Sequence, residues 1–196
     1  LAVSLSISNL QQETSAATEE TTDQDTSRMD TTAAQDAAAL LSEDSSLAVL
    51  NTAGQGIGGN ILITSYSQVE ILPVRVIGGT SGQGGGLAIL SHASVACVGM
   101  LLDSNAAAEG GALYVGNGSD VQINGSVIEN NIASRLGGGA GYIQEAKHIG
   151  IHGSIIRQNI AVGLGQLANG GGIHAESTTM SFKMVVMEKN TCDGDE

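Results

Sequence analysis

The chain has 196 residues, enough for one domain with a core, but it carries only three Tyr, one Phe and no Trp. Its 28 Gly and single Pro favour tight bends between short strands over long helices. The net charge of −13 argues against nucleic acid as a partner, and no apolar run approaches the ~18 residues of a transmembrane helix.

Residues 1–10 contain the stretch SLSISNL, whose alternation predicts a strand of a preceding coil. Residues 11–57 predict a long acidic, Ala- and Thr-rich loop inserted at one corner, in which Arg28 is the only basic residue. Its first half is polar enough to favour a mobile loop, and Thr31 to Leu41 fit a short helix. The loop either binds a protein or glycan partner or is a tolerated insertion.

Residues 58–196 repeat with a period of 25–33 residues, which is typical of solenoids. Each repeat begins with a glycine pair, and the pairs end at Gly59, Gly86, Gly111, Gly139 and Gly172. A short run follows each pair (NILI, LAIL, ALYV, AGYI and IHAE), and then a second strand such as DVQINGSVIENN. The glycines supply positive φ or close backbone approach at a corner.

The five second strands align without a gap and give three apolar columns. The columns are Val69, Val95, Val121, Ile149 and Met180; Ile71, Cys97, Ile123, Ile151 and Phe182; and Val76, Leu102, Ile128, Ile156 and Met187. Alternation with a period of two buries one face of a strand. The sequence therefore predicts an all-β, parallel β-helix of about five to six coils, interrupted by the one long acidic loop; its right-handed sense is what the family resemblance given below implies.

A polar column follows the third apolar column: Asn105, Asn131, Asn159 and Asn190. A corner turns backbone N–H and C=O groups inward, and an inward Asn has one acceptor and two donors with which to pair them. We expect these residues to form a structural ladder through the stack. The alternative is that they are exposed turn asparagines.

The glycine pair and the hydrophobe-x-x-Asn signature resemble the repeats of polymorphic outer-membrane proteins and of related pectin-lyase-like, right-handed β-helices. The resemblance covers residues 58–192, and GGAL at 110–113 matches the glycine motif fully. The Phe that the family places before the Asn is replaced here by Leu102, Ile128, Ile156 and Met187. The resemblance implies a part of a large secreted, adhesive or surface-anchored protein.

One column gives the candidates for catalysis: Asp103, Glu129, Arg157 and Glu188, one residue per coil. Carboxylates one coil apart approach the ~5–5.5 Å separation of a retaining glycosidase pair. The alternative is a surface ladder in which Arg157 pairs with Glu129 and Glu188. Few basic residues and almost no aromatic residues accompany the column, so the hypothesis of a polysaccharide lyase, epimerase or glycosidase using Asp103, Glu129 and Arg157 ranks second.

No Cys/His cluster or glycine-rich phosphate loop predicts a metal or a cofactor, and the terminal DGDE is too short to count as a calcium motif. Three coils separate Cys97 from Cys192, so the stack places them ~14 Å apart and excludes a disulfide between them. Cys97 is expected to be a free, buried thiol, and Cys192 to be either free or paired with a cysteine outside this sequence. Two Asn-x-Ser sequons, at Asn117 and Asn124, fall on turns or outward positions and are candidates for glycosylation.

Neither end of the repeat region carries a polar capping element, which predicts that the chain is an excerpt of a longer solenoid whose partners include neighbouring coils or domains. We expect a rigid, non-catalytic structural or adhesive segment, outside the cell or at its surface. It would serve as a spacer, an adhesin or a filament building block.

Overall fold

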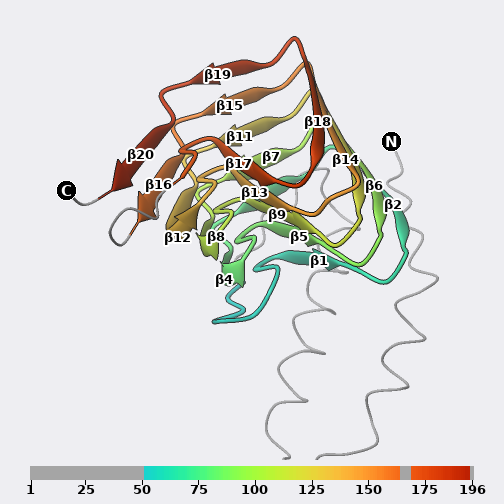
Figure 1. The fold of residues 1–196 in the computed structure, drawn as a ribbon, viewed down its shortest axis with the longest axis horizontal. Coiled ribbons are helices and arrows are strands. Elements are labelled where there is room, and N and C mark those ends of the chain that lie inside the picture. Colours follow the sequence, from blue (N-terminus) through green and yellow to red (C-terminus); the bar gives the residue numbers. More distant parts are fainter. Residues whose placement is uncertain (1–50, 164–168, 195–196) are drawn as a thin grey trace, which may run out of the picture. The chain divides into compact units, whose positions relative to one another are not determined.

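The computed structural model describes residues 51–163 and 169–194. The expected strand at 1–10 and most of the expected loop at 11–57 lie outside the described residues. Within them every regular element is a strand, and the strands form four parallel sheets stacked as a β-solenoid of about five turns (Figure 1). The predicted all-β parallel β-helix is confirmed. No helix in the described ranges is long and apolar enough to cross a membrane.

Each coil contributes one strand to each of the four sheets. The first sheet contains β1 (Ile61–Ile63), β5 (Leu87–Ile89), β9 (Leu113–Gly116), β13 (Gly141–Gln144) and β17 (Ile173–Glu176). The second contains β2 (Gln68–Ile71), β6 (Ser94–Val98), β10 (Asp120–Asn124), β14 (His148–His152) and β18 (Thr179–Lys183).

The third sheet contains β3 (Arg75–Ile77), β7 (Leu101–Asp103), β11 (Val127–Glu129), β15 (Ile155–Arg157) and β19 (Val186–Glu188). The fourth contains β4 (Thr80–Gln83), β8 (Ala106–Glu109), β12 (Ile132–Gly137), β16 (Ile160–Gly163) and β20 (Thr191–Gly194). Thr52 and Ile57 add isolated parallel bridges to Thr80 and Gln83 of β4.

The strand registers confirm all three apolar columns. Val69 pairs with Val95 and so on to Met180, and the columns that begin at Ile71 and Val76 run in the same way to Phe182 and Met187. In the middle coils these side chains are almost fully buried and form one continuous core. The slender aliphatic side chains suit this core because facing sheets leave room for only one layer from each side.

Two expectations about the strands were wrong in detail. The segment predicted as one second strand is two strands joined by a corner, where Gly99, Gly125 and Gly153 have positive φ. The glycine pairs of two coils are also shifted by one residue. Each of these two coils has three consecutive glycines. The register of Ile61 with Leu87 shows that the pair in the second coil is Gly84 and Gly85, so it ends one residue before Gly86. In the fifth coil the pair is likewise Gly170 and Gly171.

The two glycines of a pair have different tasks. The first has positive φ in every coil, at 63° in Gly110 for example. The second lies against the next coil: a Cβ on Gly111 would come within 2.4 Å of the carbonyl oxygen of Gly139. Only glycine fits both conditions, because L side chains avoid positive φ and a Cβ would collide with that oxygen.

Candidate functional site

The predicted charged column lies on the outer face of the third sheet. Parallel register places Asp103 beside Glu129, Glu129 beside Arg157, and Arg157 beside Glu188. These residues end β7, β11, β15 and β19, and the alternation of each strand turns them away from the core column at Leu102 and Ile128. The first three are half-buried and Glu188 is exposed.

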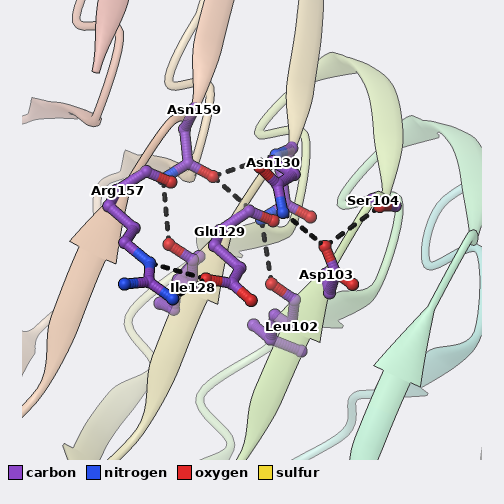
Figure 2. A network of polar contacts seen from close by, with 9 residues as sticks. Leu102, Asp103, Ser104, Ile128, Glu129, Asn130, Arg157 and Asn159 are labelled. Atoms are coloured by element: carbon purple, nitrogen blue, oxygen red, sulfur yellow. Dashed lines mark hydrogen bonds and ion pairs between the residues drawn. The ribbon is translucent and has the colours of Figure 1, made fainter. Parts of the chain in front are cut away.

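Glu129 and Arg157 form an ion pair across adjacent coils (Figure 2). Nε and Nη2 of Arg157 lie 2.7 and 2.6 Å from the same carboxylate oxygen, Oε2 of Glu129. Asp103 accepts hydrogen bonds from Nδ2 of Asn130 at 2.9 Å and from the hydroxyl of Ser104 at 3.0 Å. Of the expected surface ladder, the described residues therefore contain the Arg157–Glu129 pair but no ion pair between Arg157 and Glu188, and Asp103 is bound by neutral donors.

Directly beneath this surface the four asparagine amides are joined into a ladder. Oδ1 of Asn131 accepts from both the backbone N–H and Nδ2 of Asn105, at 2.9 and 3.0 Å. Asn131 donates in the same two ways to Asn159, and Asn159 donates to Asn190. Nδ2 of Asn131 also donates to the carbonyls of Leu102 and Glu129, so one side chain serves both its own corner and the coil before it.

The backbone explains why the corner needs an amide. The residue before each ladder position has positive φ: Ser104 at 57°, Asn130 at 57°, Gln158 at 55° and Lys189 at 54°. This conformation turns the following peptide groups into the coil, where no water reaches them. Asn105, Asn131 and Asn159 are at most 1% exposed. Each would leave several buried groups unpaired if it lost its amide.

In the first coil the ladder position is a glycine, Gly79, and a different residue supplies the amide. Nδ2 of Asn60 lies 3.4 Å from Oδ1 of Asn105 and 3.5 Å from the carbonyl oxygen of Ile77, the contacts that an asparagine at position 79 would make. Oδ1 of Asn60 is buried, without a partner among the described residues. One turn earlier, Asn51 is in ladder register, since its carbonyl accepts the Thr80 N–H.

A second buried ladder, which was not predicted from the sequence, lies at the corner between the second and third sheets. The backbone N–H of Met100 donates to the hydroxyl of Ser126 at 3.1 Å, and the N–H of Ser126 donates to the hydroxyl of Ser154 at the same distance. Each hydroxyl donates back to a carbonyl two residues earlier. The signal available in the sequence was a serine directly before each third-sheet strand, in Ser126-Val127-Ile128 and in Ser154-Ile155-Ile156.

An aromatic stack runs along the outer side of the first sheet, although the chain has few aromatic residues and none was expected to form a platform. The rings of Tyr114 and Tyr142 stack with centroids 5.8 Å apart, and Tyr142 stacks on His174 at 5.0 Å. Leu90 and Leu136 pack against the tyrosines, which are at most 7% exposed. The rings present little free surface, so they stabilise the stack of coils rather than offer a flat face to a sugar ring.

The polar ends of this stack are coupled to carboxylates. Nε2 of His174 lies 2.8 Å from Oε1 of Glu176, and this contact lowers the pKa of the glutamate. Burial raises the pKa of Tyr142 to about 12, and the nearby Glu176 adds to the rise. The pKa of Tyr114 is raised for the same first reason and by Glu109. The phenols therefore stay protonated and donate, as Tyr142 does to Glu176 at 3.4 Å.

The outer face of the second sheet carries a further polar cluster. Nδ1 of His148 lies 3.1 Å from Nε2 of Gln122 and 3.5 Å from Oδ1 of Asp120, and its Nε2 lies 3.3 Å from the hydroxyl of Ser181. Lys147 pairs with the other oxygen of Asp120 at 3.1 Å. A shallow open depression beside Asp120 extends over β6 and β2. The contacts join three successive coils, those of β10, β14 and β18.

Both cysteines are free, which agrees with the expectation for Cys97 and with one of the two alternatives for Cys192. Cys97 is fully buried in the second apolar column, and burial raises the pKa of its thiol to about 12. Cys192 is exposed on β20, in a different sheet.

The two sequons differ in their surroundings. Asn117 is exposed on a turn with φ of 52°, whereas Asn124 is half-buried at the end of β10. The serine of each sequon is buried: Ser119 donates to the carbonyl of Gly116, and Ser126 belongs to the serine ladder. Each serine therefore has a structural task whether or not the asparagine is modified.

Over residues 51–163 and 169–194, no group of three or more His, Cys, Asp or Glu side chains is arranged to hold a metal ion. The chain matches no protein-family model, no curated protein and no solved structure. The parallel β-solenoid is therefore established by the strands and registers themselves.

Proposed function

We propose that the chain is a rigid, non-catalytic segment of a large extracellular or cell-surface protein, serving as a spacer, adhesin or filament building block. The observation that carries this proposal is the continuous asparagine ladder, in which every corner is hydrogen bonded to the next. Two further side-chain ladders, the serines and the aromatic stack, run in the same direction. Side chains that join successive coils oppose separation along the stacking axis.

The finer resemblance supports the same proposal. The glycine pairs and the hydrophobe-x-x-Asn motif occupy corners of the solenoid, as the repeats of polymorphic outer-membrane and pectin-lyase-like proteins imply. A surface location suits the exposed sequon at Asn117, which is the better placed of the two for a glycan. The partners of such a segment are the coils or domains of a longer chain, and a protein or glycan at the acidic loop.

Force spectroscopy on the full chain, held between two marker domains, tests the mechanical role. We expect a cooperative unfolding event whose force falls in Asn131→Ala, because Asn131 belongs to the buried ladder. The force should be unchanged in Asn130→Gly, because glycine keeps the φ of 57° at this exposed position without strain. Asn130 is exposed and bonds Asp103 on the surface. Equal unfolding forces in the two variants would contradict the proposal.

The second candidate is a carbohydrate-active enzyme, because Asp103, Glu129 and Arg157 lie side by side on one outer face. Carboxylates on adjacent parallel strands are separated by roughly the ~5–5.5 Å of a retaining glycosidase pair. Incubation of the chain with uronans and neutral polysaccharides tests it. Turnover that Glu129→Gln abolishes and Glu188→Gln leaves intact would replace the structural proposal with this one.

A further inference from the structure

The outer face of the third sheet carries an apolar stripe beside the charged column. In parallel register, the first residues of four of its strands align as Leu101, Val127, Ile155 and Val186. The alternation of each strand turns them away from the core; the first three are half-buried and Val186 is 51% exposed. Arg75 takes the same position in the first coil and is exposed. Contiguous apolar surface of this kind marks a place of contact with another molecule.

The charges beside the stripe are incompletely paired. Arg75 and Glu188 are exposed, and neither forms an ion pair with a described residue. Nη1 of Arg157 and Oδ2 of Asp103 also have no hydrogen-bond partner in this part of the chain. Arg75 belongs to the first coil and Glu188 to the fifth, while Asp103 belongs to the second coil. Arg157 belongs to the fourth, so opposite charges lie at equal distances on either side of the third coil.

We propose that this face binds a second copy of the chain, related to the first by a two-fold axis that runs along β11, so that the two stacks are antiparallel. Such an axis keeps the positions along the strands aligned and reverses the order of the coils. The first coil of one copy therefore faces the fifth coil of the other. Val127 meets Val127 of the second copy at the axis, and Leu101 meets Ile155. The contact is isologous, so the assembly closes as a dimer.

The charge pattern selects this occupant. Asp103 lies opposite Arg157 of the second copy, whose Nη1 is free to donate. Arg75 lies opposite Val186, and Glu188 is two residues further along the same strand. Facing sheets are ~10 Å apart and alternate residues of a strand ~6.6 Å, so the long Arg75 side chain reaches the Glu188 carboxylate. Each pair occurs twice in the dimer.

Two further features of the arrangement matter for its energy. Glu129 meets Glu129 of the second copy, but each carboxylate is already neutralised by its own Arg157 at 2.6 Å. A two-fold axis along the stack would instead set each coil against the same coil, with Leu101 against Asp103 and Val127 against Glu129. That arrangement buries charges against apolar side chains, which costs free energy. The antiparallel dimer avoids this cost.

The size of the stripe sets the expected affinity. Five strands spaced ~4.8 Å apart make it only about 19 Å long. It therefore buries less than the ~1,600 Å² of a standard interface, and the dimer should be weak. We expect sedimentation velocity of the full chain to give a dissociation constant between about 10 μM and 1 mM, at about 0.15 M salt to screen the net charge of −13. A chain that stays monomeric at about 2 mM would overturn the proposal.

Charge reversal tests the register. Arg75→Glu and Glu188→Arg should each weaken the dimer at least about tenfold, and the double variant should return to within about threefold of the parent. The single changes alter the net charge in opposite directions, so a general effect of charge would weaken only one of them. Lys183→Glu and Glu70→Arg make the same changes at exposed positions of the second sheet and should leave the dissociation constant unaltered. A double variant as weak as the single ones would contradict the pairing.

Cross-linking at the axis tests the geometry independently. In a Cys192→Ser background, Val127→Cys should be joined between copies by a bis-maleimide that spans ~10 Å, the distance between facing sheets. Ser94→Cys, exposed on the outer face of β6, is the control and should stay unjoined. Cys97 is fully buried and does not compete. Equal yields from the two positions would place the contact elsewhere and refute the axis. The force measurements on single chains do not depend on this outcome.

Discussion

Asn60 and Gly79 together do what one asparagine does in each later coil. Gly79 keeps the ladder backbone, since its N–H donates to Oδ1 of Asn105 at 2.9 Å, and Asn60 supplies the side-chain amide from the opposite side of the corner. An asparagine does not fit at position 79, because a Cβ there would lie 2.0 Å from the carbonyl oxygen of Gly85 and 2.5 Å from Nδ2 of Asn60.

This relationship predicts a large effect for a residue outside the repeat motif. Asn60→Ala should lower the free energy of unfolding by about 1–3 kcal/mol, because the carbonyl of Ile77 loses its donor. Gln68→Ala, an exposed change in the same coil, should have almost no effect. Chemical denaturation of the full chain measures both. The double variant Asn60→Ala with Gly79→Asn should be no more stable than Asn60→Ala alone; a rescue would show that position 79 accepts a side chain.

The middle of the ladder gives the matched comparison. Asn131→Ala should lower the free energy of unfolding by about 1–3 kcal/mol, since the carbonyls of Leu102 and Glu129 and the N–H of Asn105 lose their partner. Asn130→Gly removes an exposed bond to Asp103, keeps the φ of 57° without strain and should cost less than this. The two denaturation midpoints are compared directly, and equal midpoints would rule out the buried role of Asn131.

Much of this fold is predictable from the sequence because the coils repeat. Alternation with a period of two fixed which side of the second-sheet strands is buried, and stacking placed like residues in one column. The corner inside the predicted second strand was missed because its marker is a single glycine, such as Gly125, within a pattern that otherwise continues. One αL residue redirects a strand without interrupting the order of apolar residues.

The remaining contacts depend on pairs distant in sequence. Nothing near Asn60 marks it as a substitute for position 79, because that role arises only when the corner of the first coil closes. The tyrosine stack had a visible signal, since Tyr114 and Tyr142 occupy the same place after their glycine pairs, but the small number of aromatic residues hid it. The column and the Glu129–Arg157 pair were both predictable from the spacing, whereas the approach of both guanidinium nitrogens to a single carboxylate oxygen was not.

The serine ladder predicts that the sequon at Asn124 has a structural serine. Ser126→Ala should lower the free energy of unfolding by about 1–3 kcal/mol, because the N–H of Met100 stays buried and loses its acceptor. Ser94→Ala, on the outer face of β6, is the control and should stay within about 0.5 kcal/mol of the parent. Thermal or urea unfolding decides the matter, and an unchanged Ser126→Ala protein would refute the ladder.

The two thiols should differ sharply in reactivity. At pH 8 an alkylating reagent should modify the exposed Cys192 and leave Cys97 intact until the chain unfolds, because the thiolate is the reactive form and Cys97 is both buried and protonated. Peptide mapping by mass spectrometry after timed labelling measures this. Native labelling of Cys97 at the rate of Cys192, or a disulfide between them, would contradict the register of the coils.

The same thiol should make the chain less stable at alkaline pH. Burial raises the pKa of Cys97 from 9.0 to about 12, so its contribution to stability is complete below pH 9 and is lost as the pH rises further. Above pH 9 the unfolded chain binds fewer protons than the folded one, and the free energy of unfolding falls by at most about 1.4 kcal/mol per pH unit from this group. Tyr142, whose pKa is raised from 10.0 to about 12, adds a second decline above pH 10.

Comparison with Cys97→Ala isolates the thiol, because the raised pKa values of Tyr114 and Tyr142 also begin to contribute between pH 9 and 10 and do so in both proteins. Cys97→Ala lowers stability at every pH because it leaves a small cavity, but it should flatten the dependence on pH in this interval, which a cavity alone does not do. Urea denaturation at pH 8, 9, 9.5 and 10 gives the two slopes, with Cys192→Ala as the control that keeps the parent slope. Parallel slopes for the parent and Cys97→Ala would show that this thiol ionises as easily in the folded chain as in the unfolded one.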